Sequence, residues 1–104
     1  MITLKSQREI DLMDKSGDFL ASIHIGLRDL IKPGLDMWEI EEYVRRRCKE
    51  DNALPLQIGV EGSVMDYPYA TCCSLNDEVA HAFPRHQRLV EGDVIKVDMV
   101  VGLV

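Results

Sequence analysis

The residues most able to do chemistry lie in the stretch Ser74–Pro84, which reads SLNDEVAHAFP. It places two carboxylates, an amide and the imidazole of His81 within eight residues. Seventeen residues beyond His81, Asp98 interrupts the apolar run Val94–Val101. A carboxylate inside a strand-like run is costly to bury unless a cation, a hydrogen-bond donor or a metal ion meets it. His81 and Asp98 are therefore the first candidates for a functional site.

Asp98 also has a purely structural interpretation. Side chains alternate between the two faces of a strand, so Lys96 and Asp98 share one face of the run and could form an ion pair. The other face carries the apolar residues Ile95, Val97, Met99 and Val101, which we expect to face the core. Both interpretations of Asp98 remain open from the residues alone.

Familiar catalytic and ligand-binding motifs are missing from the 104 residues. There is no glycine-rich phosphate loop, HExxH helix, zinc-finger spacing, GxSxG elbow or EF-hand loop. One histidine and one aspartate cannot fill a metal shell, since even an open catalytic zinc site uses about three protein ligands.

Composition limits the class of protein. The 104 residues are 46% apolar and 29% charged, which is typical of a single globular domain with a small core. The net charge of −6 argues against a nucleic-acid partner, because binding to phosphate backbones depends on clustered lysine and arginine. The only basic cluster, Arg45–Arg47, is flanked by acidic residues, and we expect it to be a solvated helix face.

Two further features bear on the compartment. The first twenty residues are too charged for a secretory or membrane segment. The three cysteines include the adjacent pair Cys72 and Cys73, and none belongs to a C-x-x-C motif. We therefore expect free thiols and a cytoplasmic location.

Hydrophobic periodicity predicts two helices ahead of these residues. A capping box at Ser6–Glu9 opens the first, which ends at Lys32–Gly34. Its apolar stripe is Ile10, Met13, Gly17, Leu20, Ile23, Leu27 and Leu30, with His24 expected in the core or at its boundary. The second helix is predicted from Asp36, with the inner stripe Ile40, Val44 and Cys48.

Extended segments follow the helices. We expect strands at 54–60, interrupted by Pro55, and at 69–75, a short extended piece at 79–82, and a last strand at 94–101. Tyr67 and Tyr69 flank a proline and either line a pocket or pack internally. The terminal apolar strand has no successor to pair with, so we expect an open edge and an interrupted domain.

The segment Cys72–Pro84, followed by Gly92–Asp98, resembles the type I methionine aminopeptidases. The family pattern is Ser-apolar-Asn-(Asp/Glu)-x-x-x-His-(Gly/Ala)-x-Pro, a spacer, then Gly-Asp and an apolar run carrying an aspartate. Ala82 and Phe83 replace the commoner Gly and Ile. Lys5-Ser6, Ile31–Gly34 and the tract 41–47 resemble the same family, so the resemblance covers essentially the whole chain.

The resemblance implies an α+β pita-bread fold, with two N-terminal helices followed by antiparallel strands. Residues 1–104 would form the N-terminal portion of a single catalytic domain whose two similar halves enclose a pair of metal ions. Asp98 matches the first of five metal ligands, and the other four would lie beyond Val104. His81 matches a histidine that hydrogen-bonds the substrate and takes part in catalysis. Tyr67 and Cys72 match positions that line the pocket for the methionine side chain.

The implied activity is removal of the N-terminal methionine from nascent proteins by a hydroxide that two divalent ions activate. Co, Mn, Fe and Zn all suit such a site. The resemblance implies a monomeric complete enzyme without membrane or nucleic-acid partners, and leaves room for association with the ribosome. For the 104 residues alone we expect weak metal binding, no activity and self-association. Two alternatives are a non-enzymatic pita-bread binding protein and a proline-specific peptidase relative.

Overall fold

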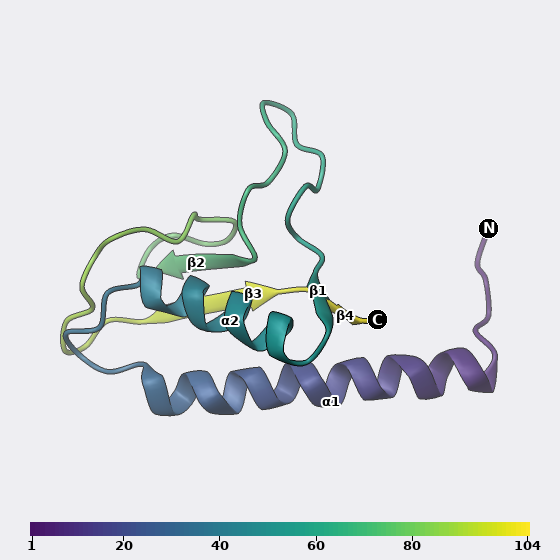
Figure 1. The fold of residues 1–104 in the computed structure, drawn as a ribbon. Helices are drawn as coiled ribbons and strands as arrows, with labels where there is room; N and C mark the ends of the chain where they lie inside the picture. The colour runs from purple at the N-terminus through teal and green to yellow at the C-terminus, as the bar shows by residue number, and fades with distance from the viewer.

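The chain folds as two helices followed by four short strands. The structure is a computed structural model that describes residues 1–104, and Figure 1 shows its fold. The elements are α1 (Gln7–Leu30), α2 (Trp38–Glu50), β1 (Ala53–Pro55), β2 (Thr71–Leu75), β3 (Ile95–Met99) and β4 (Val101–Leu103). α1 packs on α2 and β4, while α2 packs on β1 and β2. The predicted order of two helices and then antiparallel strands is confirmed.

The helix α1 begins with the predicted capping box. The Glu9 backbone N–H donates to Ser6 Oγ at 3.2 Å, and the Ser6 N–H donates to the Glu9 carboxylate at 2.8 Å. Only the C-terminal half of the helix is buried, because α1 extends past the other elements toward the N-terminus (Figure 1). Ile10 and Met13 are therefore 48% and 56% exposed. His24 is exposed as well, so its predicted place in or beside the core is wrong.

The helix α2 begins at Trp38, two residues later than predicted. The N-cap is Met37, without a side-chain cap, and Asp36 just before it accepts from the Trp38 N–H at Oδ1, 3.2 Å away. Glu39 reaches back to the Asp36 N–H at 3.3 Å. The predicted inner stripe of Ile40, Val44 and Cys48 is buried.

The basic cluster on α2 is only partly the solvated face that we predicted. Arg46 is exposed, but the side chain of Arg47 is 22% exposed. Arg47 donates to Ser22 Oγ on α1 at 2.7 Å and to the Tyr43 hydroxyl at 2.9 Å. Arg45 donates to the carbonyl of Pro68 at 3.2 Å. Arg47 therefore ties the two helices together, and Arg45 ties α2 to the segment before β2.

The four strands form a two-stranded ribbon. One side is β3 followed by β4, and the other is β1 and β2, which are separated by residues 56–70. β1 pairs with β4 and β2 pairs with β3, both antiparallel, with Ala53 opposite Leu103 and Thr71 opposite Met99. The carbonyl of Val94 accepts from Asn76 N and that of Val100 from Leu56 N, so β1 and β2 lie end to end along the same edge. Residues 57–70 leave this edge as a long excursion.

Two predictions of extended structure are wrong in extent. The strand expected at 54–60 ends at Pro55, because the chain turns away there, and the piece expected at 79–82 is not extended throughout, since His81 has a φ of +63°. Within residues 1–104, β3 and β4 are each paired on one side only.

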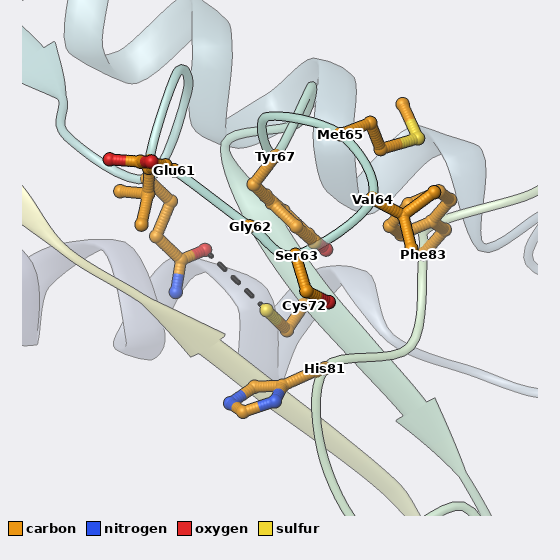
Figure 2. A pocket seen from close by; sticks show the side chains of 11 residues that line it. Glu61, Gly62, Ser63, Val64, Met65, Tyr67, Cys72, His81 and Phe83 are labelled. Atoms are coloured by element: carbon orange, nitrogen blue, oxygen red, sulfur yellow. Dashed lines mark hydrogen bonds between the residues drawn. The ribbon is translucent and has the colours of Figure 1, made fainter.

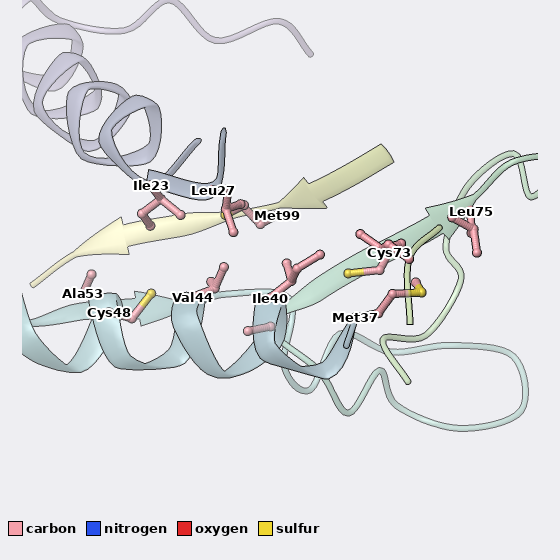
Figure 3. Packing of buried hydrophobic residues seen from close by; sticks show 12 residues of the cluster. Ile23, Leu27, Met37, Ile40, Val44, Cys48, Ala53, Cys73, Leu75 and Met99 are labelled. Atoms are coloured by element: carbon pink, nitrogen blue, oxygen red, sulfur yellow. The ribbon is translucent and has the colours of Figure 1, made fainter. Parts of the chain in front are cut away.

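The core lies between the helices and the inner face of this ribbon (Figure 3). Its members include Ile23, Leu27, Met37, Ile40, Val44, Cys48, Cys73, Leu75 and Met99. The predicted alternation on β3 is confirmed, since Ile95, Val97 and Met99 face the core while Lys96 and Asp98 are exposed. Neither helix is long and apolar enough to cross a membrane.

A polar clamp joins the end of β2 to the start of β3. Asn76 adopts a positive φ of 54°, and its amide donates to Asp93 Oδ1 at 3.1 Å and accepts from Val94 N at 2.9 Å. The other Asp93 oxygen accepts from Val90 N at 2.8 Å, across a turn in which Gly92 has a φ of +90°. The Asn76 and Gly92-Asp93 positions of the sequence motif therefore fix the ribbon.

Candidate active site: a cavity beside the interrupted strand

The excursion between β1 and β2 borders a cavity of about 430 Å³. Figure 2 shows the side chains around it, which come from the excursion, from β2 and from the segment after the Asn76 turn. The lining residues are Gln57, Val60, Glu61, Gly62, Ser63, Val64, Met65, Tyr67, Cys72, His81 and Phe83. Three of the four residues predicted as site residues, Tyr67, Cys72 and His81, thus meet at one cavity.

His81 reaches the cavity through an unusual backbone conformation. Its backbone φ is +63°, in the left-handed region that residues other than glycine rarely adopt. The next residue is pinned against β2, because Ala82 O accepts from Cys73 N at 2.9 Å and Ala82 N donates to Ser74 Oγ at 3.3 Å. The fold thus holds the imidazole at the cavity instead of in the extended run that we expected.

Tyr67 and Cys72 form adjoining parts of the wall. The Tyr67 hydroxyl donates to the carbonyl of Thr71 at 2.7 Å, and its burial raises the pKa well above the usual range. Tyr67 is therefore a neutral phenol at physiological pH. Cys72 is 4% exposed, and its thiol donates to Gln57 Oε1 at 3.7 Å (Figure 2).

An aromatic cluster supports the outer part of the cavity. The Phe83 ring lies 5.3 Å from that of Tyr67 and 5.1 Å from that of Tyr69, both edge to face. Tyr69 also meets the Trp38 ring at 5.7 Å. Of the two interpretations left open for the tyrosines, lining a pocket holds for Tyr67, which lines the cavity. Internal packing holds for Tyr69, which packs against α2.

Several residues that line the cavity or support its wall were not identified from the sequence. Gln57 and Val60 line the cavity, although their segment was predicted to be a strand, and Phe83 was noted only as a departure from a motif. Glu41 is fully buried beneath the start of β2. The burial of Glu41 could have been predicted, since Glu41, Val44 and Cys48 follow the i, i+3, i+7 spacing of one helix face.

Asp98 lies beside the cavity but does not line it. It sits directly opposite Cys72 in the β2–β3 register, so the two side chains leave the same face of the ribbon. Asp98 is exposed and forms no ion pair. Lys96 instead donates to the Asn76 carbonyl at 2.9 Å, so the Lys96–Asp98 pair does not form.

The residues present do not by themselves fit a metal centre. No group of three or more His, Cys, Asp or Glu side chains is placed to hold an ion. Asp98 offers a single carboxylate, and one carboxylate retains a divalent cation only weakly. What these 104 residues do bring together is an apolar cavity, an imidazole at its wall and a carboxylate on the neighbouring strand.

Comparison with known proteins gives a consistent result. Residues 11–103 match metallopeptidase family M24. A methionine aminopeptidase from Aquifex aeolicus is 35% identical over 100 residues, which are 93% of this chain and 39% of that protein. One from Clostridium perfringens is 33% identical over 103 residues, which are 99% of this chain and 40% of that protein.

Solved structures agree with the sequence relatives. A methionine aminopeptidase from Streptococci has a TM-score of 0.96 and 82% identity, with 98% of this chain matching 37% of that one. The Thermotoga maritima enzyme has a TM-score of 0.85 and 34% identity, covering 99% of this chain and 40% of that one. The predicted pita-bread fold is confirmed, and the chain spans about two fifths of these relatives. Since its match extends over nearly all of its residues, the chain belongs to metallopeptidase family M24.

Proposed function

We propose that this chain forms the substrate-binding part of a methionine aminopeptidase, an enzyme that removes the N-terminal methionine from nascent proteins. The observation that carries the proposal is the meeting of Tyr67, Cys72 and His81 at one cavity. Because the chain spans about two fifths of its relatives, we assign the complete reaction to a protein of the family's full length.

The cavity suits an unbranched apolar side chain. Val60, Val64, Met65, Tyr67 and Phe83 give it a predominantly apolar wall. A thioether makes favourable contacts with aromatic ring edges, and Tyr67 and Phe83 supply two such rings. Among the polar lining residues, the Cys72 thiol and Gln57 are paired with each other, so this part of the wall favours an apolar ligand.

His81 is proposed to act on the peptide bond next to the bound side chain. An imidazole N–H can donate a hydrogen bond to the carbonyl oxygen or orient the amide. A donor aimed at the oxygen where charge develops stabilises the tetrahedral carbon more than the planar ground state. The fixed backbone around His81 holds the donor in place before the substrate arrives.

Asp98 is proposed as one carboxylate ligand of a metal pair. Carboxylate-rich sites accept Co, Mn, Fe or Zn, and such a pair, when bound, lowers the pKa of water so that hydroxide is available near neutral pH. The remaining ligands are assigned to the part of the family fold that these residues do not include. Residues 1–104 alone are accordingly proposed to be inactive. We place the protein in the cytoplasm, as its three free cysteines favour.

Binding of small amides to the 104-residue chain tests the cavity assignment. L-methionine amide and L-alanine amide share the amino and amide groups and differ only in the side chain, so they form a matched pair. In a titration followed by NMR, methionine amide should shift the resonances of Tyr67, Cys72 and His81 at lower concentration than alanine amide. Equal responses to the two amides, or shifts that map elsewhere, would contradict the proposal.

A further inference from the structure

We propose that Glu41 is the positioning residue of the cavity, fixing the start of β2 and through it both Tyr67 and Cys72. The choice of ligand rests on the proposed function, while the positioning itself does not. Glu41 lies on α2, touches no part of the cavity and is fully buried. A buried carboxylate is retained only where its partners replace water completely.

The partners of Glu41 fill its acceptor sites. One carboxylate oxygen accepts from the backbone N–H of Thr71 at 3.0 Å and from its hydroxyl at 2.6 Å. The other accepts from Ala70 N at 2.7 Å and from Arg45 Nε at 2.6 Å. Two oxygens and four donors match the capacity of a carboxylate. Three of these donors belong to the two residues where the excursion re-enters the ribbon.

Thr71 is directly connected to two residues of the cavity wall. Its carbonyl accepts the hydrogen bond from the Tyr67 hydroxyl at 2.7 Å, and Cys72 is the next residue along β2. Both predicted pocket residues are therefore attached to one residue, and that residue is held by Glu41. Arg45 adds a second link, because it also donates to the Pro68 carbonyl within the excursion.

The arrangement requires an acceptor at both oxygens. In Glu41→Gln the amide oxygen can keep two of the donors, but whichever way the amide is turned, its NH₂ group faces the backbone N–H of Ala70 or of Thr71 and cannot accept from it. Volume and helix position are unchanged. Glu42→Gln is the matched control, since Glu42 is the adjacent residue on α2, is exposed and makes no hydrogen bond or ion pair.

The first measurement is thiol labelling of the native 104-residue chain with iodoacetamide, read by mass spectrometry. Cys72 lies beside Thr71, while Cys48 lies on α2, and the two are similarly buried at 4% and 2% exposed. In the Glu41→Gln variant, iodoacetamide should label Cys72 about tenfold faster than in the wild type, because β2 opens locally more easily. The labelling rate of Cys48 should be unchanged. Glu42→Gln should match the wild type at both sites. If Glu41 only stabilised the whole fold, Glu41→Gln would raise the labelling rates of Cys72 and Cys48 together.

The second measurement is the methionine amide titration on the same variants. Glu41→Gln should weaken binding about tenfold with an otherwise native spectrum, and Glu42→Gln should not. If methionine amide binds the wild type no better than alanine amide, the proposed function fails, while the labelling still tests Glu41. Labelling of Cys72 that is equal in the two variants, or that rises in step with Cys48, would overturn the positioning role.

A second pair of variants covers the case in which Glu41→Gln does not fold. Thr71→Val removes one of the four donors and keeps the side-chain shape, whereas Thr71→Ser keeps the hydroxyl. Thr71→Val should label Cys72 selectively faster, and Thr71→Ser should restore the wild-type rate. If both variants behave like the wild type, the hydroxyl bond to Glu41 does not hold the wall and the proposal is wrong.

Discussion

Each of the three histidines is placed differently by the fold. His24 points to solvent from α1, and His86 pairs with Asp36 at 2.7 Å on an exposed loop. Only His81 reaches the cavity, held there by the bonds that Ala82 makes to Cys73 and Ser74. Residue type alone could not show which of the three histidines lies at the cavity. The motif around His81 singled it out as a candidate site residue.

Replacing His81 tests its role directly. We consider a chimera in which these 104 residues replace the matching 37% of the streptococcal methionine aminopeptidase, to which they are 82% identical. In the chimera His81→Ala should lower kcat by a factor of about 10² or more with a smaller effect on KM, as expected for loss of a transition-state donor. Steady-state kinetics on a methionyl peptide measure both values. His86→Ala is the control, and an unchanged kcat in His81→Ala would remove His81 from the mechanism.

The fold brings together at one cavity three residues that the family resemblance singled out, whose roles stay predictions, whereas the residues that support them were missed. Tyr67, Cys72 and His81 were identified by resemblance, and all three line the cavity. Glu41 was missed because a carboxylate among helical charges usually faces solvent, and only its spacing with Val44 and Cys48 hinted at burial. Gln57 was missed because nothing local shows that the chain leaves the ribbon after Pro55.

At the scale of elements, helices were easier to predict than strands. The capping box and the apolar period define α1 locally, whereas the burial of its stripe depends on how far the other elements extend. The strands depend on partners distant in the chain. β1 and β2 pair with the successive strands β4 and β3, and these partners cannot be identified from the residues between 57 and 70.

The clamp at Asp93 predicts a pH-dependent stability. Hydrogen bonds from Val90 N and then from the Asn76 amide lower the pKa of Asp93 below its ordinary value of 3.8. The ionised form is favoured by folding, so this stabilisation is present above that value and is lost as the pH falls through the lower folded pKa. Asp93→Asn should therefore lower Tm at pH 7, and the difference from wild type should close in strong acid.

Thermal melts followed by circular dichroism over this pH range provide the measurement. Asp77→Asn makes the same chemical change at an exposed residue without hydrogen bonds and should leave Tm unchanged at every pH. A Tm difference for Asp93→Asn that stays constant into strong acid would show that the carboxylate charge does not contribute to the clamp.

The whole molecule exposes more surface than a compact protein of its size. Its accessible area is 7232 Å², whereas a compact chain of 11.8 kDa exposes about 5,900 Å². The radius of gyration is 15.0 Å, against about 13 Å for a compact domain. The excess, roughly 1,300 Å², exceeds the ~800 Å² that each partner contributes to a standard protein interface.

This surplus predicts self-association of the 104-residue chain. Within residues 1–104 the outer edge of β3 and β4 is unpaired. The exposed apolar Val100 lies between these two strands, and the exposed Leu54 lies on β1, which pairs with β4. Sedimentation over about a hundredfold range of concentration should show a rising mass, and Tm should rise with it. Val100→Lys should reduce association, while Val79→Lys, at an exposed position away from the edge, should not. A sharp, concentration-independent monomeric melt would contradict this prediction.

The most direct test of the account is hydrolysis of the peptide Met-Ala-Ser by the chimera with the streptococcal enzyme in the presence of Mn²⁺ or Co²⁺. If these residues form the methionine-binding wall and supply one metal ligand, the folded chimera should release free methionine, and the 104-residue chain alone should release none. A folded chimera without activity would show that this chain cannot serve as that wall. Turnover by the 104-residue chain alone would show that it needs no further metal ligands.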